Sequence, residues 1–109
     1  MPLISIVAPC YNEQESLPIF LKELDGVVRA MNQQDPGISF EAVLIDDGSA
    51  DRTLTVMKTE AVSSHPYAIH WHSFSRNFGK EAALLAGLQH AKGDYVATMD
   101  ADMQDPPSL

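Results

Sequence analysis

The sequence predicts a three-layer α/β domain in which a mainly parallel sheet is covered by helices on both faces. Short apolar stretches suited to strands alternate with segments whose apolar residues recur at helical spacing, from an initial strand to a final one. Alternation of this kind favours parallel pairing with right-handed crossovers. Polar residues also gather directly after the predicted strands, where ligands bind in such sheets.

The first predicted strand and helix are the most regular part of the chain. Residues 3–8 form a β-branched apolar strand that we expect to be buried on both faces. Pro9 is expected to end its pairing, because proline has no N–H. Ser16 is expected as the N-cap of an amphipathic helix whose apolar face extends to Met31.

The remaining elements repeat the same alternation. Strands are expected at 40–45, 69–74 and 95–99, and helices at 51–63 and 80–91. Small residues line one side of the last helix, so this helix can lie close against the sheet.

Composition limits the size and the partners of the molecule. The 109 residues suit one domain, and a hydrophobic content of 45% is enough for a core. The net charge of -8 argues against nucleic acid or an anionic membrane surface as a partner. The single cysteine, Cys10, excludes an internal disulfide and is expected to be a small buried residue. No apolar run approaches the ~20 residues of a membrane helix and there is no secretory signal, so we expect a cytoplasmic location.

Two aspartates follow the last predicted strand. Asp100 and Asp102 are two residues apart, so in extended chain their carboxylates point the same way. Carboxylates that close repel unless a cation lies between them, and a hard divalent ion with oxygen ligands fits this need. An isolated Asp-x-Asp is more often a solvated strand end. The preceding strand and a second acidic pair at another strand end favour the metal interpretation here.

Other polar residues near strand ends have two interpretations each. Asp46 and Asp47 are either part of a turn or acceptors for a ribose hydroxyl or a base N–H. Arg76 and Lys80 flank the N-terminus of the last predicted helix, where they suit a phosphate or, alternatively, pair with nearby acids. Tyr11 lies at the mouth of the first strand, where it can stay near a base. The chain has neither a P-loop nor a Gly-x-Gly-x-x-Gly motif after a strand.

Four segments together resemble family 2 glycosyltransferases of the GT-A fold. Within that family they are most similar to the polyprenyl-phosphate group, which comprises dolichol-phosphate mannosyltransferases and undecaprenyl-phosphate glucosyltransferases. The segments are Ile6–Glu13, Val43–Thr53, Ser75–Ala83 and Met99–Pro107. The resemblance implies a Rossmann-like GT-A sheet. It also implies that residues 1–109 are the nucleotide-sugar-binding part of a longer domain, truncated after the metal-binding strand end.

The resemblance assigns roles to individual residues. The implied nucleotide-binding residues are Pro9, Tyr11, Glu13, Asp46, Asp47, Arg76, Lys80 and Asp100. Asp100 and Asp102 are implied as catalytic residues that ligate Mg²⁺ or Mn²⁺, and Gln104 is implied to face the donor sugar.

The activity implied is transfer of a sugar from a UDP-sugar or GDP-sugar to an undecaprenyl or dolichyl phosphate. The acceptor oxygen is already anionic, so little or no general base is needed. Membrane association, at the cytoplasmic face, would come from sequence missing here, and self-association through an exposed sheet edge stays open. Two alternatives also stay open: a catalytically silent nucleotide-binding module, and a phosphotransfer domain with an aspartate as phosphoryl acceptor.

Overall fold

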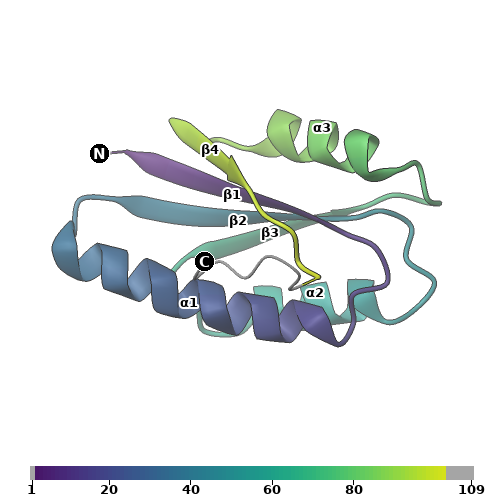
Figure 1. Ribbon diagram of the computed structural model, residues 1–109, viewed down its shortest axis with the longest axis horizontal. Coiled ribbons are helices and arrows are strands. Elements are labelled where there is room, and N and C mark those ends of the chain that lie inside the picture. Colours follow the sequence, from purple (N-terminus) through teal and green to yellow (C-terminus); the bar gives the residue numbers. More distant parts are fainter. Residues whose placement is uncertain (1, 103–109) are drawn as a thin grey trace.

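A computed structural model describes residues 2–102, which form a four-stranded parallel sheet with helices on both faces (Figure 1). The strands are β1 (Leu3–Cys10), β2 (Ser39–Asp46), β3 (Ala68–Ser73) and β4 (Tyr95–Thr98). The helices are α1 (Ser16–Gln34), α2 (Thr53–Ala61) and α3 (Lys80–His90). The sheet order is β3-β2-β1-β4, and each neighbouring pair is parallel. The predicted α/β fold class is confirmed.

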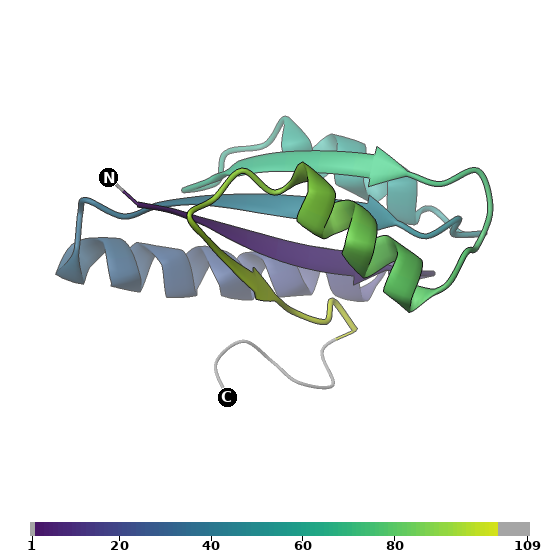
Figure 2. The ribbon, with the colours of Figure 1, turned by 90° about the horizontal axis from the view of Figure 1, so that it is seen from above.

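The two faces of the sheet carry separate cores. Helices α1 and α2 cover one face and α3 covers the other (Figure 2). The apolar stripe of α1 is buried at steps of three and four residues, at Leu17, Phe20, Leu21, Leu24 and Val28. On the opposite face, Ala83 and Gly87 of α3 are buried near Val7 of β1. The prediction that small residues let the last helix lie close to the sheet is therefore confirmed.

Strand β1 continues past Pro9, so the prediction that this residue ends its pairing is wrong. Pro9 and Cys10 both stay in register with β2. The Cys10 carbonyl accepts a hydrogen bond from the Asp47 N–H, so the backbone groups of Cys10 point toward β2. Successive residues of a strand alternate in this respect, so the backbone groups of Pro9 point toward β4. Pairing with β4 ends at the Val7–Thr98 register, so the missing N–H of Pro9 costs no ladder bond among the described residues.

The start of α1 is also organised differently from the prediction. Ser16 is the first helical residue, and Glu15 at the N-cap position makes no side-chain capping bond. Instead, the Thr53 hydroxyl accepts the Glu13 N–H at 2.8 Å, and the Asp51 carboxylate accepts the Gln14 N–H at 3.3 Å. The chain that enters α1 is therefore held by side chains distant in sequence, which a local capping pattern does not reveal.

The other predicted elements are present. The β2, β3, α3 and β4 bounds each lie within one residue of the expected ranges, whereas α2 is shorter than expected at both ends. Within residues 2–102, none of the helices has the combination of length and apolar content needed to cross a bilayer.

Candidate functional site

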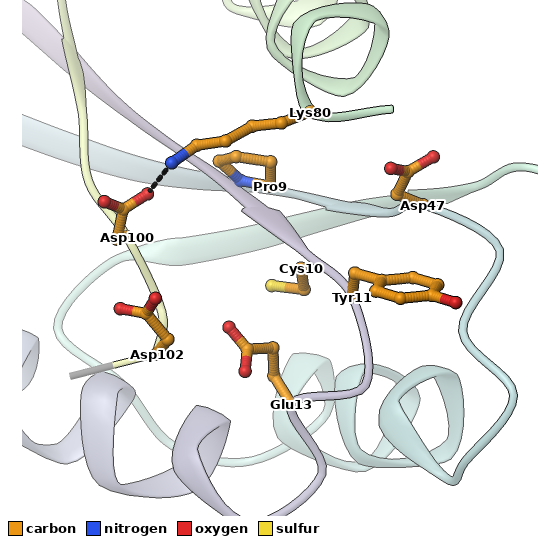
Figure 3. A pocket seen from close by; sticks show the side chains of 8 residues that line it. All are labelled: Pro9, Cys10, Tyr11, Glu13, Asp47, Lys80, Asp100 and Asp102. Carbon is orange, nitrogen blue, oxygen red and sulfur yellow. Dashed lines mark ion pairs between the residues drawn. The ribbon is translucent and has the colours of Figure 1, made fainter. Parts of the chain in front are cut away.

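A cavity of about 250 Å³ lies at the carboxyl edge of the sheet (Figure 3). Its lining residues are Pro9, Cys10, Tyr11, Glu13, Asp47, Lys80, Asp100 and Asp102. They come from the ends of β1, β2 and β4 and from the first residue of α3. Every lining residue except Cys10 is one that the sequence analysis selects, so the fold brings together side chains from four separate segments.

One side of the cavity is acidic. Figure 3 shows the carboxylates of Glu13, Asp100 and Asp102 along the same wall. Partial burial raises the pKa of Glu13, and the negative charges of Asp102 and Asp100 raise it further. These three side chains are therefore close enough to repel one another, and the wall they form is suited to a cation.

The opposite charge in the cavity is supplied by Lys80. Its Nζ lies 2.7 Å from Oδ1 of Asp100, and the two side chains are 61% and 35% exposed. Lys80 is the first residue of α3, so its backbone position is set by the loop that precedes this helix.

That loop is anchored by Asp47. The Asp47 side chain is only 3% exposed, and both of its carboxylate oxygens are hydrogen-bonded. Oδ1 accepts the Phe78 N–H at 2.8 Å, and Oδ2 accepts the Gly79 N–H at 3.1 Å. The Asn77 side-chain amide also donates to Oδ2, at 3.0 Å. Asp47 thus borders the cavity while tying the start of α3 to the end of β2.

Two predicted site residues do not line the cavity. Asp46 is buried and accepts a hydrogen bond from the Ser73 hydroxyl at 2.8 Å. Arg76 is exposed, and its guanidinium carbon lies 4.7 Å from the centre of the Phe78 ring. Gln104, the residue expected near the donor sugar, lies outside the described residues.

Cys10 is the lining residue that the sequence analysis does not select. Its thiol is buried and donates to the Ala8 carbonyl at 3.5 Å. Burial raises the pKa of Cys10, with smaller contributions from Glu13 and Asp46, so the sulfur stays a neutral thiol and a poor nucleophile. Its position between Pro9 and Tyr11, at the end of a strand, is the sequence signal from which Cys10 could have been predicted to line the cavity.

The carboxylates of the cavity suit a divalent ion that is bound partly by the protein and partly by a phosphate-containing ligand. Residues 2–102 contain no group of three or more His, Cys, Asp or Glu side chains arranged to hold a metal by themselves. Mg²⁺ is usually held by one or two carboxylates together with substrate phosphates and water. Asp100 and Asp102, on the wall of one cavity, fit that mode of binding.

The fold and the cavity define a doubly wound α/β domain with an acidic cavity at the carboxyl edge of its sheet. The family model described as "Glycosyl transferase family 2" matches residues 5–109. The chain belongs to this family, as the four sequence segments indicate.

Relatives with assigned names share much of this sequence. The undecaprenyl-phosphate 4-deoxy-4-formamido-L-arabinose transferase of Pseudomonas paraeruginosa is 41% identical over 105 residues, which are 96% of this chain and 29% of that protein. The bactoprenol glucosyl transferase of Shigella phage SfV is 47% identical over 103 residues, which are 94% of this chain and 31% of that protein. The chain thus spans less than a third of the length of these relatives.

Solved structures have the same fold. Staphylococcus aureus TarS 1–349 in complex with UDP superposes with a TM-score of 0.72 at 25% identity, covering 91% of this chain and 27% of that one. The mannosyltransferase PcManGT from Pyrobaculum calidifontis, solved with GDP-Man and Mn²⁺, gives a TM-score of 0.71 at 29% identity. That match covers 93% of this chain and 28% of the mannosyltransferase. The GT-A fold expected from the sequence is confirmed.

Proposed function

We propose that residues 1–109 are the donor-binding part of a glycosyltransferase that moves a sugar from a UDP-sugar or GDP-sugar to a polyprenyl phosphate. The observation that carries this proposal is the cavity that joins Tyr11, Lys80 and the Asp100–Asp102 pair at one edge of the sheet. The names of the relatives support the polyprenyl-phosphate acceptor, and the ligands of the solved neighbours support a nucleotide-sugar donor. In the full-length protein this part would work at the cytoplasmic face of the membrane.

Different cavity residues would contact different parts of the nucleotide-sugar donor. Tyr11 is 49% exposed and offers an aromatic ring to the base, and Pro9 lines the same cavity. Lys80 supplies positive charge for the diphosphate. Asp100 and Asp102 would hold Mg²⁺ or Mn²⁺, which, when bound, neutralises charge on the diphosphate leaving group. Asp47 positions Lys80 through the loop before α3, in addition to any contact with the base or ribose.

The phosphotransfer alternative is less compatible with this geometry. A phosphoryl acceptor needs a carboxylate oxygen that its donor can reach. Asp46 and Asp47 are each 3% exposed. Both oxygens of Asp46 accept hydrogen bonds, from the Ser49 N–H and the Ser73 hydroxyl, and both oxygens of Asp47 accept bonds from the loop before α3.

Calorimetric titration tests the donor site directly. UDP and GDP are titrated into the chain with Mn²⁺ and then with EDTA, and circular dichroism confirms that the sample is folded. We expect one nucleotide to bind and EDTA to weaken its binding at least tenfold, because the acidic wall alone repels a diphosphate. Asp102→Asn should remove most of this metal dependence. Asp35→Asn, in an exposed turn, is the matched control and should behave like the wild type.

Sugar transfer separates an enzyme from a silent nucleotide-binding module. Full-length protein is incubated with labelled UDP-glucose or GDP-mannose and undecaprenyl phosphate, and lipid-linked label is measured. Transfer that is lost in the Asp102→Asn variant supports the proposal. A folded chain that binds neither nucleotide contradicts a working donor site, and nucleotide binding without transfer by the full-length protein indicates the silent module.

A further inference from the structure

Lys80 lies at a position that is electrostatically unfavourable for a cation. It is the first residue of α3, where backbone N–H groups make the helix end positive, and the acids near that end are Glu81 in the first turn and Asp47, which accepts the N-cap Gly79 N–H. Negatively charged residues are the ones favoured in a first turn. The chain nevertheless has a lysine there and directs its ammonium group across the cavity to Asp100 (Figure 3).

The ammonium group lies against the acidic wall to which the proposed function assigns a divalent ion. Among the described residues that line the cavity, Lys80 is the only lysine or arginine, and four lining residues are acidic. Its Nζ lies 2.7 Å from Asp100, the distance of a direct charge-assisted hydrogen bond. Lys80 thus neutralises part of the charge that would otherwise be left on Asp100.

We propose that Lys80 is an exchangeable counter-ion: it holds Asp100 while the site is empty of donor, and moves to the donor diphosphate when a divalent ion takes over that carboxylate. This inference rests on the proposed function, because it assumes that the cavity takes a nucleoside diphosphate and a metal. It goes further in two respects. The Lys80 ammonium group and the divalent ion compete for the Asp100 carboxylate, and Lys80 contacts Asp100 before the donor binds and the diphosphate afterwards.

The structure provides what such an exchange needs. The Lys80–Asp100 pair is partly exposed, so it contributes little stability and is easily broken. The backbone before Lys80 is held by the hydrogen bonds from Phe78 and Gly79 to Asp47. The exchange therefore requires rotation of one flexible side chain and no movement of α3.

The exchange has a consequence for metal binding that simple diphosphate recognition does not have. The ammonium group competes with a metal for Asp100 when no nucleotide is present, and it assists binding once the diphosphate arrives. Removing the charge at position 80 should therefore strengthen binding of the metal alone and weaken binding of the nucleotide with the metal. A lysine that only binds phosphate would show the second effect without the first.

Mn²⁺ binding measured by electron paramagnetic resonance tests this, because free Mn²⁺ gives a signal that is lost on binding and no activity is needed. Wild type, Lys80→Met, Lys80→Arg and Lys92→Met are compared, the last being an equal charge change on an exposed residue beyond the far end of α3. We expect Lys80→Met to bind Mn²⁺ alone about two- to fivefold tighter than the wild type, the range of an exposed ion pair. Lys80→Arg and Lys92→Met should each stay close to the wild-type affinity.

The same four proteins are then titrated with UDP and GDP in saturating Mn²⁺. We expect Lys80→Met to bind the preferred nucleotide roughly tenfold more weakly, as for loss of one hydrogen bond to a charged group. Mn²⁺ affinity in Lys80→Met that is equal to or below that of the wild type overturns the counter-ion role. Unchanged nucleotide affinity in Lys80→Met overturns the movement to the diphosphate. If the wild type binds neither nucleotide, the proposed function fails, while the comparison with Mn²⁺ alone still tests the competition for Asp100.

Discussion

Asp47 shows how one side chain links the fold to the candidate site. It follows β2 directly, borders the cavity, and accepts hydrogen bonds from the backbone N–H groups of Phe78 and Gly79. These donors belong to the turn that leads into α3 and so to Lys80. An acid that would be assigned to ligand binding from sequence alone is therefore also an anchor for the loop that carries Lys80 into the cavity.

Replacing Asp47 by asparagine should destabilise the chain and disturb the site together. The amide offers one acceptor oxygen where the carboxylate offers two, so the part-buried donors of Asn77 and Gly79 lose the oxygen that they share, at a cost of about 1–3 kcal/mol. Asp94→Asn is the matched control, because Asp94 also accepts a backbone N–H, from Leu3, but is exposed. Urea denaturation measures both variants, and equal stability of the two would contradict the anchoring role.

Glu13 illustrates a residue whose charge opposes folding. Burial and the nearby Asp102 and Asp100 raise its pKa, so the charged carboxylate is less favourable in the folded chain than in the unfolded chain. The associated stability is present below the unfolded-state pKa and is lost as pH rises through the higher folded-state pKa. At neutral pH, Glu13 is therefore a small cost to stability.

Glu13→Gln should remove that cost. We expect the variant to be more stable than the wild type at pH 7 by about 0.5 kcal/mol or less, since the group is partly solvated. The gain should vanish in acid, where wild-type Glu13 is itself protonated. Thermal unfolding at several pH values checks this, with Glu23→Gln in the middle of α1 as control. A gain that does not change with pH would point to a cause other than charge.

At the scale of elements, the closeness of α3 to the sheet depends on Gly87. A Cβ at this position would lie 2.3 Å from Cγ1 of Val7, which is fully buried. Helix α3 is the element whose first residue enters the cavity, so its distance from β1 also determines where Lys80 lies.

Two glycine-to-alanine substitutions in helices should have opposite effects. Gly87→Ala should destabilise the chain by about 1–3 kcal/mol, because the added methyl group forces α3 away from Val7. Gly26→Ala in α1 meets nothing within 4 Å, so it should stabilise by about 0.5–1 kcal/mol through helix propensity. Denaturant midpoints measure both. Stabilisation by Gly87→Ala would show that the sheet and helix can separate without cost.

For the whole molecule, the notable feature is the outer side of β4. Within residues 2–102 this strand pairs with β1 alone, and its Tyr95 and Val96 side chains are 67% and 43% exposed. A strand edge with apolar side chains is a template for pairing with another chain. We therefore expect the 109-residue chain to self-associate as its concentration rises.

Val96→Lys should suppress this association, because lysine on an edge strand opposes pairing. Sedimentation velocity over a hundredfold concentration range measures it. Ile19→Lys is the control, since it places the same charge on an exposed apolar residue of α1, away from the strand edge. A wild type that stays monomeric throughout, or equal suppression by Ile19→Lys, would rule out pairing through β4.

Much of this architecture could be predicted from residue patterns. Alternation of apolar stretches determined the order of strands and helices, because burial imposes the period of each element on the sequence. The parallel topology then placed the residues that follow β1, β2 and β4 at one edge. These patterns indicated Tyr11, Asp47, Lys80, Asp100 and Asp102 as candidates, whereas Pro9 and Glu13 were implied by the resemblance to family 2 glycosyltransferases.

The tertiary structure alone decided which polar groups contact each other. Arg76 and Lys80 were equivalent candidates in the sequence, yet only Lys80 lines the cavity, whereas Arg76 lies over Phe78. Thr53, not a local cap, holds the chain that enters α1. These partners lie in separate segments, and their contacts depend on strand register and helix placement, which local periodicity does not encode. The sequence therefore determined where polar groups gather, and the packing of the chain determined how they pair.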